Sequence, residues 1–438
     1  MLALITPQSC YGKEMKEKLR PFLPGQEEDL KREFVKIREC AVKLTETEQP
    51  VWQKMQSVFA TIPNIGEEID LVEQGLILNE IHLFNVKKFL YLSRSLFRLL
   101  EQTQLLPQDN YAAFLPPEMV EKEYLNHQNQ GYQFYLGDYG GEDYLKLQQE
   151  IRELSALLAE TAENEAGMFR SELGLGDKCF SGDYLYISIN ERELMEKVLG
   201  SPRWERYQDF GTEICFLRKI TLAEKKFDEE INQKRQEADA LELGIRKRLT
   251  NLIKEHIAYF DQGQKELGYC DFLLAKAQFM ARYNCTIPRI VMEKAIDLQQ
   301  GINLNIKNEL KKNQKKFTPI SLSFDQKSVV ITGANMGGKT VTLKTLGLAV
   351  AMAQHGIPVS AESFSGPLFH FLFYAGESKE KTGLSSFAGE IEQLKVILSR
   401  IKERGLILLD EPARSTNPQE GLAIVGAFLK TMAQGDPI

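Results

Sequence analysis

Long apolar runs, a leader-like start and paired cysteines are all missing from this 438-residue sequence. No stretch approaches the roughly 18 to 20 unbroken apolar residues that a membrane helix needs. The opening MLALITPQ has neither the basic segment nor the long apolar segment of a secretory signal. The six cysteines form no CxxC pair and the five histidines are scattered, which predicts reduced thiols and no zinc site. We therefore expect a cytoplasmic protein without a membrane partner.

Charge is unevenly divided along the chain. Residues 1–300 hold 38 basic and 49 acidic side chains, whereas residues 301–438 hold 16 and 12. A chain of this length is too long for one ordinary core, so we expect two to four domains. The larger part of the molecule is acidic, which is unfavourable for tracking a polyanion.

Helical spacing dominates the first two thirds of the sequence. Residues 1–108 carry apolar side chains at helical spacing, and residues 107–144 break this pattern with Pro, Gly, Asn and Tyr. Long polar helices are predicted at residues 144–169 and 220–256, and the run YLYISI at residues 184–189 predicts a strand between them. The second helix exceeds the usual 8 to 20 residues, which favours a protruding antiparallel arm over two ordinary bundle helices.

The octapeptide GANMGGKT at residues 333–340 fits G-x-x-x-x-G-K-[ST] at every fixed position. It follows an apolar run at residues 327–332, predicted to be a strand, and opens a predicted helix at residues 339–355 that closes on Gly356. The glycines allow backbone N–H groups to face a phosphate, and Lys339 supplies positive charge at the helix N-terminus. The predicted nucleotide-binding residues are Gly333, Asn335, Gly337, Gly338, Lys339 and Thr340.

The second motif is the run LILLDE at residues 406–411, an apolar strand that ends in two carboxylates. Buried carboxylates are costly without a partner cation, and a phosphate-bound Mg²⁺ provides one. We expect Asp410 and the Thr340 hydroxyl to hold Mg²⁺, and Glu411 to act as the catalytic residue that orients or deprotonates the attacking water. The two motifs together predict an ATPase whose cofactors are ATP and Mg²⁺.

These residues resemble those of a known family. The segment TGANMGGKT at residues 332–340 resembles the TGPNMGGKS/T loop of MutS-family ATPases, with Ala334 in place of the proline. The segment DEPARST at residues 410–416 is similar to the family's DELGRGT, from which Pro412 and Ala413 depart. Further segments resemble the MutS branch that lacks the mismatch-reading domain. This resemblance implies an ABC-like ATPase.

The resemblance also implies a dimer that closes on DNA. The segment GLSSFAGEI at residues 383–391 is similar to the family's G-x-S-T-F-x-x-E-M, whose hydroxyls reach the nucleotide of the opposite subunit. Carried over, this assigns Ser385 and Ser386 to a homodimer joined through an ATP sandwich. The segment DFLLAKA at residues 271–277 resembles the end of the family's lever helix, which implies a clamp around DNA in repair or recombination.

Two observations leave the target open. The predicted tip, residues 176–215, has five basic and eight acidic side chains, whereas a clamp on DNA gains affinity from basic ones. Residues 308–320 and 413–418 also resemble, less specifically, the MutS-like ATPases that accompany cobalamin-dependent lysine aminomutases. That resemblance implies a reactivase with an aminomutase protein client.

The sequence stops at residue 438, before the strand with a switch-loop histidine and the dimerisation helices that the resemblance implies. We expect a truncated ATPase domain with slow turnover, and a nucleotide-binding scaffold is the third function considered.

The predicted fold is mixed: an α-helical core with a long helical lever and clamp arm, followed by an ABC-like P-loop α/β ATPase domain. The predicted domains are a helical core at 1–143, an arm at 144–270 with its tip at about 176–215, a return to the core and connector at 271–306, and the ATPase domain at 307–438.

Overall fold

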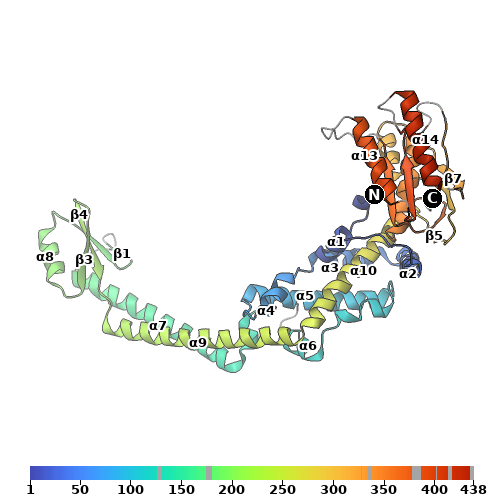
Figure 1. Ribbon diagram of the computed structural model, residues 1–438. Helices are drawn as coiled ribbons and strands as arrows, with labels where there is room; N and C mark the ends of the chain where they lie inside the picture. The colour runs from blue at the N-terminus through green and yellow to red at the C-terminus, as the bar shows by residue number, and fades with distance from the viewer. Residues whose placement is uncertain are drawn as a thin grey trace. The chain divides into compact units, whose positions relative to one another are not determined.

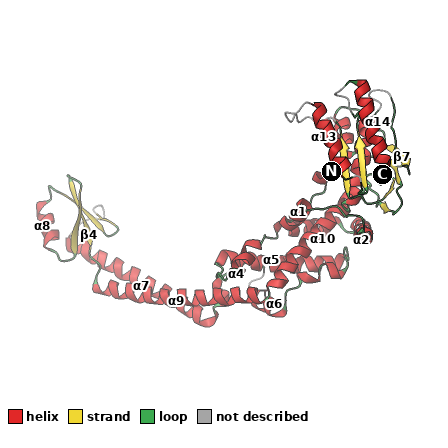
Figure 2. Ribbon diagram, viewed as in Figure 1, coloured by secondary structure: helices red, strands yellow, loops and turns green. Residues whose placement is uncertain are grey.

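The computed structural model describes residues 1–125, 131–173, 180–326, 328–333, 338–376, 386–400, 402–412 and 417–434. The described chain is rich in helix and carries small sheets, which confirms the mixed fold class (Figures 1 and 2). None of its helices is long and apolar enough to cross a membrane. The chain divides into two compact units. The first comprises Met1–Asn64, Lys88–Glu121 and His256–Ile438, and the second comprises Ile65–Lys87 and Lys122–Glu255.

The first unit begins with helices and continues into strands and helices that alternate. Two helices are shared between the units: α5 (Glu80–Thr103) and α6 (Glu118–Leu125). The other helical elements of the first unit are η1 (Leu2–Leu4), α1 (Cys10–Glu17), α2 (Glu27–Glu46), α3 (Gln49–Thr61), η2 (Gln108–Asn110), η3 (Ala112–Phe114), α10 (Ile257–Tyr283), α11 (Leu304–Lys312), α12 (Lys339–Gln354), α13 (Ser386–Ser399) and α14 (Pro418–Gln434).

The strands of the first unit form two sheets. These strands are β5 (Arg289–Ile290), β6 (Ile296–Gly301), β7 (Ile320–Phe324), β8 (Ser363–Gly366), β9 (Phe371–Ala375) and β10 (Gly405–Leu409). One sheet has the order β5-β8-β6-β7, and the other is the parallel pair β10-β9. A shared apolar core lies between α10, α12 and the strands, and it includes Phe279, Ile296 and Leu408.

A buried carboxylate ties the start of the chain to α10. Asp271, on α10, accepts hydrogen bonds from the Ser9 hydroxyl at 2.6 Å and from the Ser9 and Gln8 amides at 2.7 and 3.0 Å. The Ser9 side chain also caps α1 by accepting from the Gly12 amide. Three donors to one buried carboxylate satisfy it without a cation, so the helices α1 and α10 are held in a fixed register.

The second unit contains two long helices and a small sheet. Its helical elements are α4 (Gly66–Glu73), η4 (Leu136–Tyr139), α7 (Gly141–Leu173), α8 (Arg192–Gly200) and α9 (Leu222–Glu255). Its strands are β1 (Phe180–Ser181), β2 (Tyr184–Ser188), β3 (Trp204–Asp209) and β4 (Glu213–Arg218), in the order β1-β2-β4-β3. We call the part of the chain between α7 and α9 the tip.

The helices α7 and α9 pack along one another and run antiparallel (Figure 1). Two contacts fix their direction: the Tyr144 hydroxyl donates to Glu242 at 2.6 Å, and Lys234 pairs with Glu150 at 2.5 Å. From the first contact to the second, the residue number rises along α7 and falls along α9. The two long helices are therefore confirmed as a neighbouring antiparallel pair.

The tip has its own apolar core. The buried side chains Leu185, Ile187, Trp204 and Phe216 of the sheet pack with Val198 of α8. All pairings in this sheet are antiparallel, and β3 bulges against β4 between Arg206 and Gln208. The strand expected at residues 184–189 is confirmed as β2, whereas the other strands and α8 were not predicted.

Two local expectations were wrong. Residues 328–332 form no strand, and they line a cavity instead. The connection at residues 107–144 is not wholly irregular, since it includes the helix α6.

Candidate functional site

Two parallel strands bring their carboxyl ends together in the first unit. In the β9–β10 ladder Leu408 lies beside Tyr374 and Leu409 beside Ala375. The Asp410 amide then donates to the Ala375 carbonyl at 2.7 Å, so the ladder extends to the first carboxylate of the sequence motif. Ligands of α/β proteins bind outside the carboxyl ends of such strands. Asp410 therefore stands at the expected edge of the sheet.

The helix α12 begins where the glycine motif ends. Gly338 precedes it with φ of 84°, a left-handed backbone conformation that strongly favours glycine. Lys339 is the first residue of the helix, and its Nζ donates to the Gly333 carbonyl at 2.9 Å. This bond joins the two described ends of the motif. Lys339 is thus held beside the loop that the sequence assigns to phosphate.

Close packing fixes α12 against β10. A Cβ on Gly347 would lie 2.7 Å from a methyl carbon of Leu408, so a larger residue here would force the Leu408 side chain to move. At its other end α12 finishes at Gln354, and Gly356 follows with φ of 64°. This confirms the predicted helix and its glycine stop. The start of α12 and the end of β10 are therefore positioned by the same local contacts.

A cavity of about 600 Å³ lies where these elements meet. Its walls are mainly apolar and include consecutive residues 406–409 of β10 and residues 328–333. Because side chains of a strand alternate between its faces, four consecutive lining residues mean that the edge of β10 faces the cavity. Lys339, Asp410 and Glu411 also line it. One cation and two carboxylates therefore converge on one hollow.

Glu411 has a backbone conformation unusual for its type. Its φ is 49°, in the left-handed region that residues other than glycine adopt uncommonly, and its side chain is exposed. Such conformations persist where the surrounding structure requires them, and they concentrate at functional sites.

Sequence reasoning missed Tyr374. Its hydroxyl donates to Oδ2 of Asp410 at 3.2 Å, and the ammonium of Lys344 lies 5.9 Å from the centre of its ring. Tyr374 therefore fixes the orientation of the carboxylate that was assigned to the metal. Only the parallel pairing of β9 with β10 brings Tyr374 and Asp410 together across 36 positions, and no local motif signals it.

The structure brings four of the predicted site residues together. The lining of one cavity includes Gly333, Lys339, Asp410 and Glu411. Gly338 and Thr340 are the sequence neighbours of Lys339. Asn335, Gly337 and Ser385 lie outside the described residues. Ser386 begins the backbone of α13, but its side chain lies outside the described part of the chain.

The donor set suits Mg²⁺ better than a softer metal. Thr340 offers a hydroxyl and Asp410 a carboxylate, and hard oxygen donors in small number are what Mg²⁺ uses when it keeps waters and substrate phosphates as ligands. Within the described residues no three or more His, Cys, Asp or Glu side chains gather to form a metal site of their own. The five described cysteines are free thiols, and burial raises the pKa of Cys40 to about 12.

Residues 329–436 match the family model for MutS domain V. Endonuclease MutS2 of Streptococcus agalactiae serotype Ia is 35% identical over 210 residues, which cover 46% of this chain and 26% of the relative. Endonuclease MutS2 of Streptococcus gordonii is 35% identical over 193 residues, covering 43% and 24%. Endonuclease MutS2 of Streptococcus pyogenes serotype M5 is 34% identical over 206 residues, covering 46% and 26%.

The matched region spans about a quarter of the length of these relatives. The comparisons therefore show similarity to the MutS family for the part of this chain that holds the glycine loop and the two carboxylates.

Proposed function

We propose that this chain is a MutS-type ATPase that binds Mg-ATP at the cavity between α12 and β10 and hydrolyses it. The observation behind the proposal is the convergence of Lys339, Asp410 and Glu411 on one cavity, with Lys339 bonded to the Gly333 carbonyl. The match of residues 329–436 to MutS domain V gives independent support. We further propose that residues 307–438 form an ABC-like P-loop domain within a cytoplasmic protein.

Each side chain has a proposed task. Lys339 exchanges the Gly333 carbonyl for the β- and γ-phosphates, with the N-terminus of α12 adding its positive end. Thr340 and Asp410 hold Mg²⁺, which when bound neutralises charge on the phosphate oxygens. Glu411 orients the attacking water and accepts its proton. The exposed position of Glu411 leaves it accessible to such a water.

The proposed site is completed by a second copy of the chain. Ser385 and Ser386 of one subunit reach the nucleotide of the other, so that ATP joins two subunits in a sandwich. This part rests on the sequence resemblance alone. Sedimentation of a Glu411→Gln variant with and without Mg-ATP tests it, because a variant that retains ATP should double in mass only when the nucleotide is present.

Phosphate release tests the central assignment. Glu411→Gln should lower the turnover number by about 100-fold or more, because a positioned general base contributes roughly that factor. The affinity for Mg-ATP should stay within about threefold, because the binding groups are unchanged. Glu420→Gln, on α14, is the matched control and should retain turnover. Unchanged turnover in Glu411→Gln would remove Glu411 from its proposed task.

DNA, in a repair or recombination setting, is the first target proposed, because the relatives are named endonucleases of the MutS2 type. A salt titration of binding to duplex and branched DNA tests this target. Phosphate contacts release counterions, so affinity should fall steeply and linearly on logarithmic axes as salt rises. Absence of binding at about 50 mM salt with Mg-ATP present would exclude DNA.

A protein client is the second target proposed, and the charge of the tip favours it. Residues 180–218 carry five basic and seven acidic side chains, and two of the basic ones are engaged in ion pairs with tip carboxylates. Such a surface suits a protein better than a polyanion. The reactivase of a cobalamin-dependent aminomutase is the form of this proposal that the sequence suggests.

A further inference from the structure

Positive charge in the first unit is concentrated in one short segment. Residues 307–316, which cover most of α11 and the turn after it, hold five basic and one acidic side chain. Residues 301–438 as a whole hold 16 and 12, so the positive excess of that region equals the excess of this segment alone. All five lysines are exposed. We call Lys307, Lys311, Lys312, Lys315 and Lys316 the lysine surface.

The helix α11 directs its lysines away from the protein. The Asn303 side chain caps the helix by accepting a hydrogen bond from the Ile306 amide at 3.3 Å. Ile306 and Leu310 lie one turn apart and are half-buried, so this side of the helix faces the protein. Lys307 and Lys311 are also one turn apart, and both are exposed on another side.

A left-handed residue fixes the end of α11 and the lysines that follow it. Gln314 has φ of 56°, a conformation that residues other than glycine adopt uncommonly. Its amide donates to the Lys311 carbonyl at 3.1 Å, and the Lys315 amide donates to the Leu310 carbonyl at 2.8 Å. These two bonds form the Schellman motif. Phe317 is buried directly after the segment, so the turn is held at both of its ends.

No ion pair compensates the lysine surface within the described part of the chain. Its five lysines pair with no described carboxylate, and Glu309, the one carboxylate of the segment, pairs with none of them. The nearest carboxylates in the sequence, Asp297 and Asp325, accept hydrogen bonds from Gln299 at 2.7 Å and from Gln326 at 2.9 Å. A surplus of one sign that is left unpaired favours a partner of the opposite sign.

Duplex DNA matches this surface better than a membrane or a single strand does. The duplex carries one negative charge per about 1.7 Å of its axis, and lysines bind its phosphates without reading the sequence. A helix that lies on a membrane exposes large apolar side chains, whereas every exposed side chain of α11 is polar. A platform for a single strand needs aromatic rings, and residues 307–316 contain none.

We propose that the lysine surface contacts the phosphates of duplex DNA independently of base sequence. Asn308, Asn313 and Gln314 are exposed among the lysines and supply further donors for phosphate and sugar oxygens. The tip has no comparable surplus, because residues 180–218 carry five basic and seven acidic side chains. The proposal rests on DNA as the first target proposed above, for which it names a contact surface, and it does not depend on ATP hydrolysis.

Fluorescence anisotropy of a labelled DNA duplex with the full chain tests the proposal. It is measured with and without Mg-ATP, and variants are compared in the state that the native chain binds more tightly. On logarithmic axes the association constant should fall with salt with a slope of about −0.9 per phosphate contacted. The triple variant Lys307→Gln, Lys311→Gln, Lys312→Gln should make this slope shallower by about 2 to 3 and weaken binding at about 50 mM salt about tenfold or more.

Two matched variants separate the lysine surface from net charge and from folding. The variant Lys54→Gln, Lys402→Gln, Lys430→Gln removes three exposed lysines elsewhere in the first unit. It should bind within about threefold of the native chain, because charges beyond a Debye length are screened. Arginine at positions 307, 311 and 312 keeps the charge and should also bind within about threefold. Equal losses in the glutamine variants would assign the effect to net charge, and a loss with arginine would contradict phosphate contact.

Failure of this proposal is distinguishable from failure of DNA as the target. If the native chain binds DNA and the triple variant keeps its affinity and slope, the lysine surface is excluded and DNA remains the target. If the native chain binds no duplex at about 50 mM salt in either nucleotide state, both proposals fall.

Other partners give other results. A triple variant that keeps DNA binding but loses binding to poly-glutamate would assign the lysine surface to an acidic protein segment. Loss of binding to phosphatidylglycerol vesicles, with DNA binding kept, would assign it to a membrane. A preference among duplexes of unrelated sequence that exceeds about tenfold and depends on these lysines would contradict contact with phosphates alone.

Discussion

Charged side chains are used in opposite ways at the proposed nucleotide cavity and where the tip joins α9. At the cavity, Lys339, Asp410 and Glu411 converge on a hollow and none of them is buried. At the tip, Arg218 and Glu224 are both buried, with side chains 4% exposed, and form two hydrogen bonds of 2.9 and 2.7 Å. The first set lines a hollow and is accessible to solvent, whereas the second is buried and paired within the protein.

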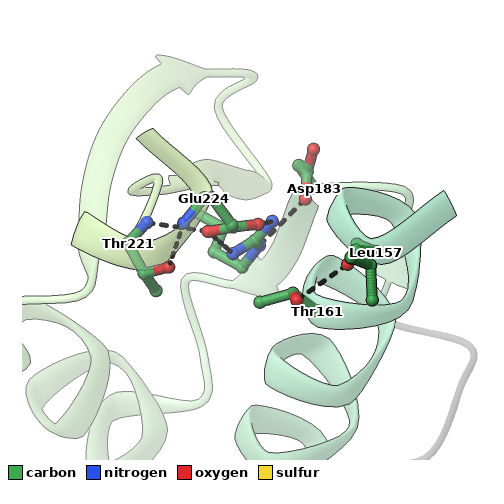
Figure 3. A network of polar contacts seen from close by, with 6 residues as sticks. Leu157, Thr161, Asp183, Thr221 and Glu224 are labelled. Atoms are coloured by element: carbon green, nitrogen blue, oxygen red, sulfur yellow. Dashed lines mark hydrogen bonds and ion pairs between the residues drawn. The ribbon is translucent and has the colours of Figure 1, made fainter. Parts of the chain in front are cut away.

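Where the tip joins α9, a cluster of charged and polar side chains forms hydrogen bonds and ion pairs among its own members (Figure 3). Glu224 accepts from the Thr221 amide at 2.7 Å while the Thr221 hydroxyl accepts from the Glu224 amide at 3.2 Å, which is a capping box at the start of α9. Arg218 also donates to Asp183 at 2.9 Å. We call Arg218, Glu224, Thr221 and Asp183 the root cluster. The comparison teaches that charged side chains which are buried and fully paired have a structural role. Charged side chains that converge on a cavity indicate a binding site.

The largest effect that sharpens this comparison is expected from Arg218→Met. It leaves Glu224 buried without its cation, which should destabilise the tip by about 3 kcal/mol or more. Native-state hydrogen exchange of the β2 and β4 amides measures this change. Arg206→Met is the matched control, because its pair with Asp209 is exposed and contributes at most about 1 kcal/mol. Equal effects of the two variants would contradict the structural assignment of the root cluster.

Acid should weaken the tip in a defined window. The Arg218 guanidinium, followed by the Thr221 donors, lowers the pKa of Glu224 to about 2. The unfolded chain binds this proton near pH 4.3, so the stabilisation is complete above that pH and is lost as the pH falls towards 2. Exchange protection of β4 should decline over this range, and Glu224→Gln should flatten the decline. An unchanged pH profile in Glu224→Gln would show that Glu224 is not the group responsible.

At the nucleotide cavity, Tyr374→Phe should have an intermediate effect. It removes the hydrogen bond to Asp410, and loss of a hydrogen bond that orients a metal-binding carboxylate typically weakens metal affinity about tenfold or more. Electron paramagnetic resonance of Mn²⁺ with ADP measures this affinity without turnover. Tyr135→Phe, an exposed tyrosine of the second unit, is the control. Unaltered Mn²⁺ affinity in Tyr374→Phe would exclude this positioning task.

The smallest effect is expected from Gly356→Ala. Its left-handed φ of 64° costs an alanine about 1 kcal/mol, and the added Cβ would lie 3.3 Å from a ring carbon of Phe22. Thermal unfolding of the first unit should shift downward by a few degrees. Gly244→Ala, in the middle of α9 with open space around its Cβ, should instead stabilise. Destabilisation by Gly244→Ala of equal size would contradict the local explanation.

The sequence predicted the parts of the molecule whose cause is local. The glycine motif predicted a helix from Lys339, and LILLDE predicted a strand that ends at two carboxylates, and the structure contains both elements. The long helices followed from spacing and from the absence of proline. These features depend on neighbours a few residues apart.

The remaining features depend on contacts between distant segments. Tyr374 reaches Asp410 only through the β9–β10 ladder, and Arg218 meets Asp183 only in the folded tip. Residues 328–332 have strand-like composition, but a strand also needs a partner edge, which composition does not report. Strand pairing and register could therefore not be predicted from the sequence, and neither could the contacts that depend on them.

Calorimetric titration of the full chain with Mg-ATP tests the central claim most directly. The native chain should bind Mg-ATP, and Lys339→Ala should weaken binding by about 100-fold or more, because it removes the positive charge next to the phosphates. Lys430→Ala, an exposed lysine of α14, should bind as the native chain does. Equal Mg-ATP affinity in Lys339→Ala and the native chain would contradict the assignment of the cavity to a nucleotide.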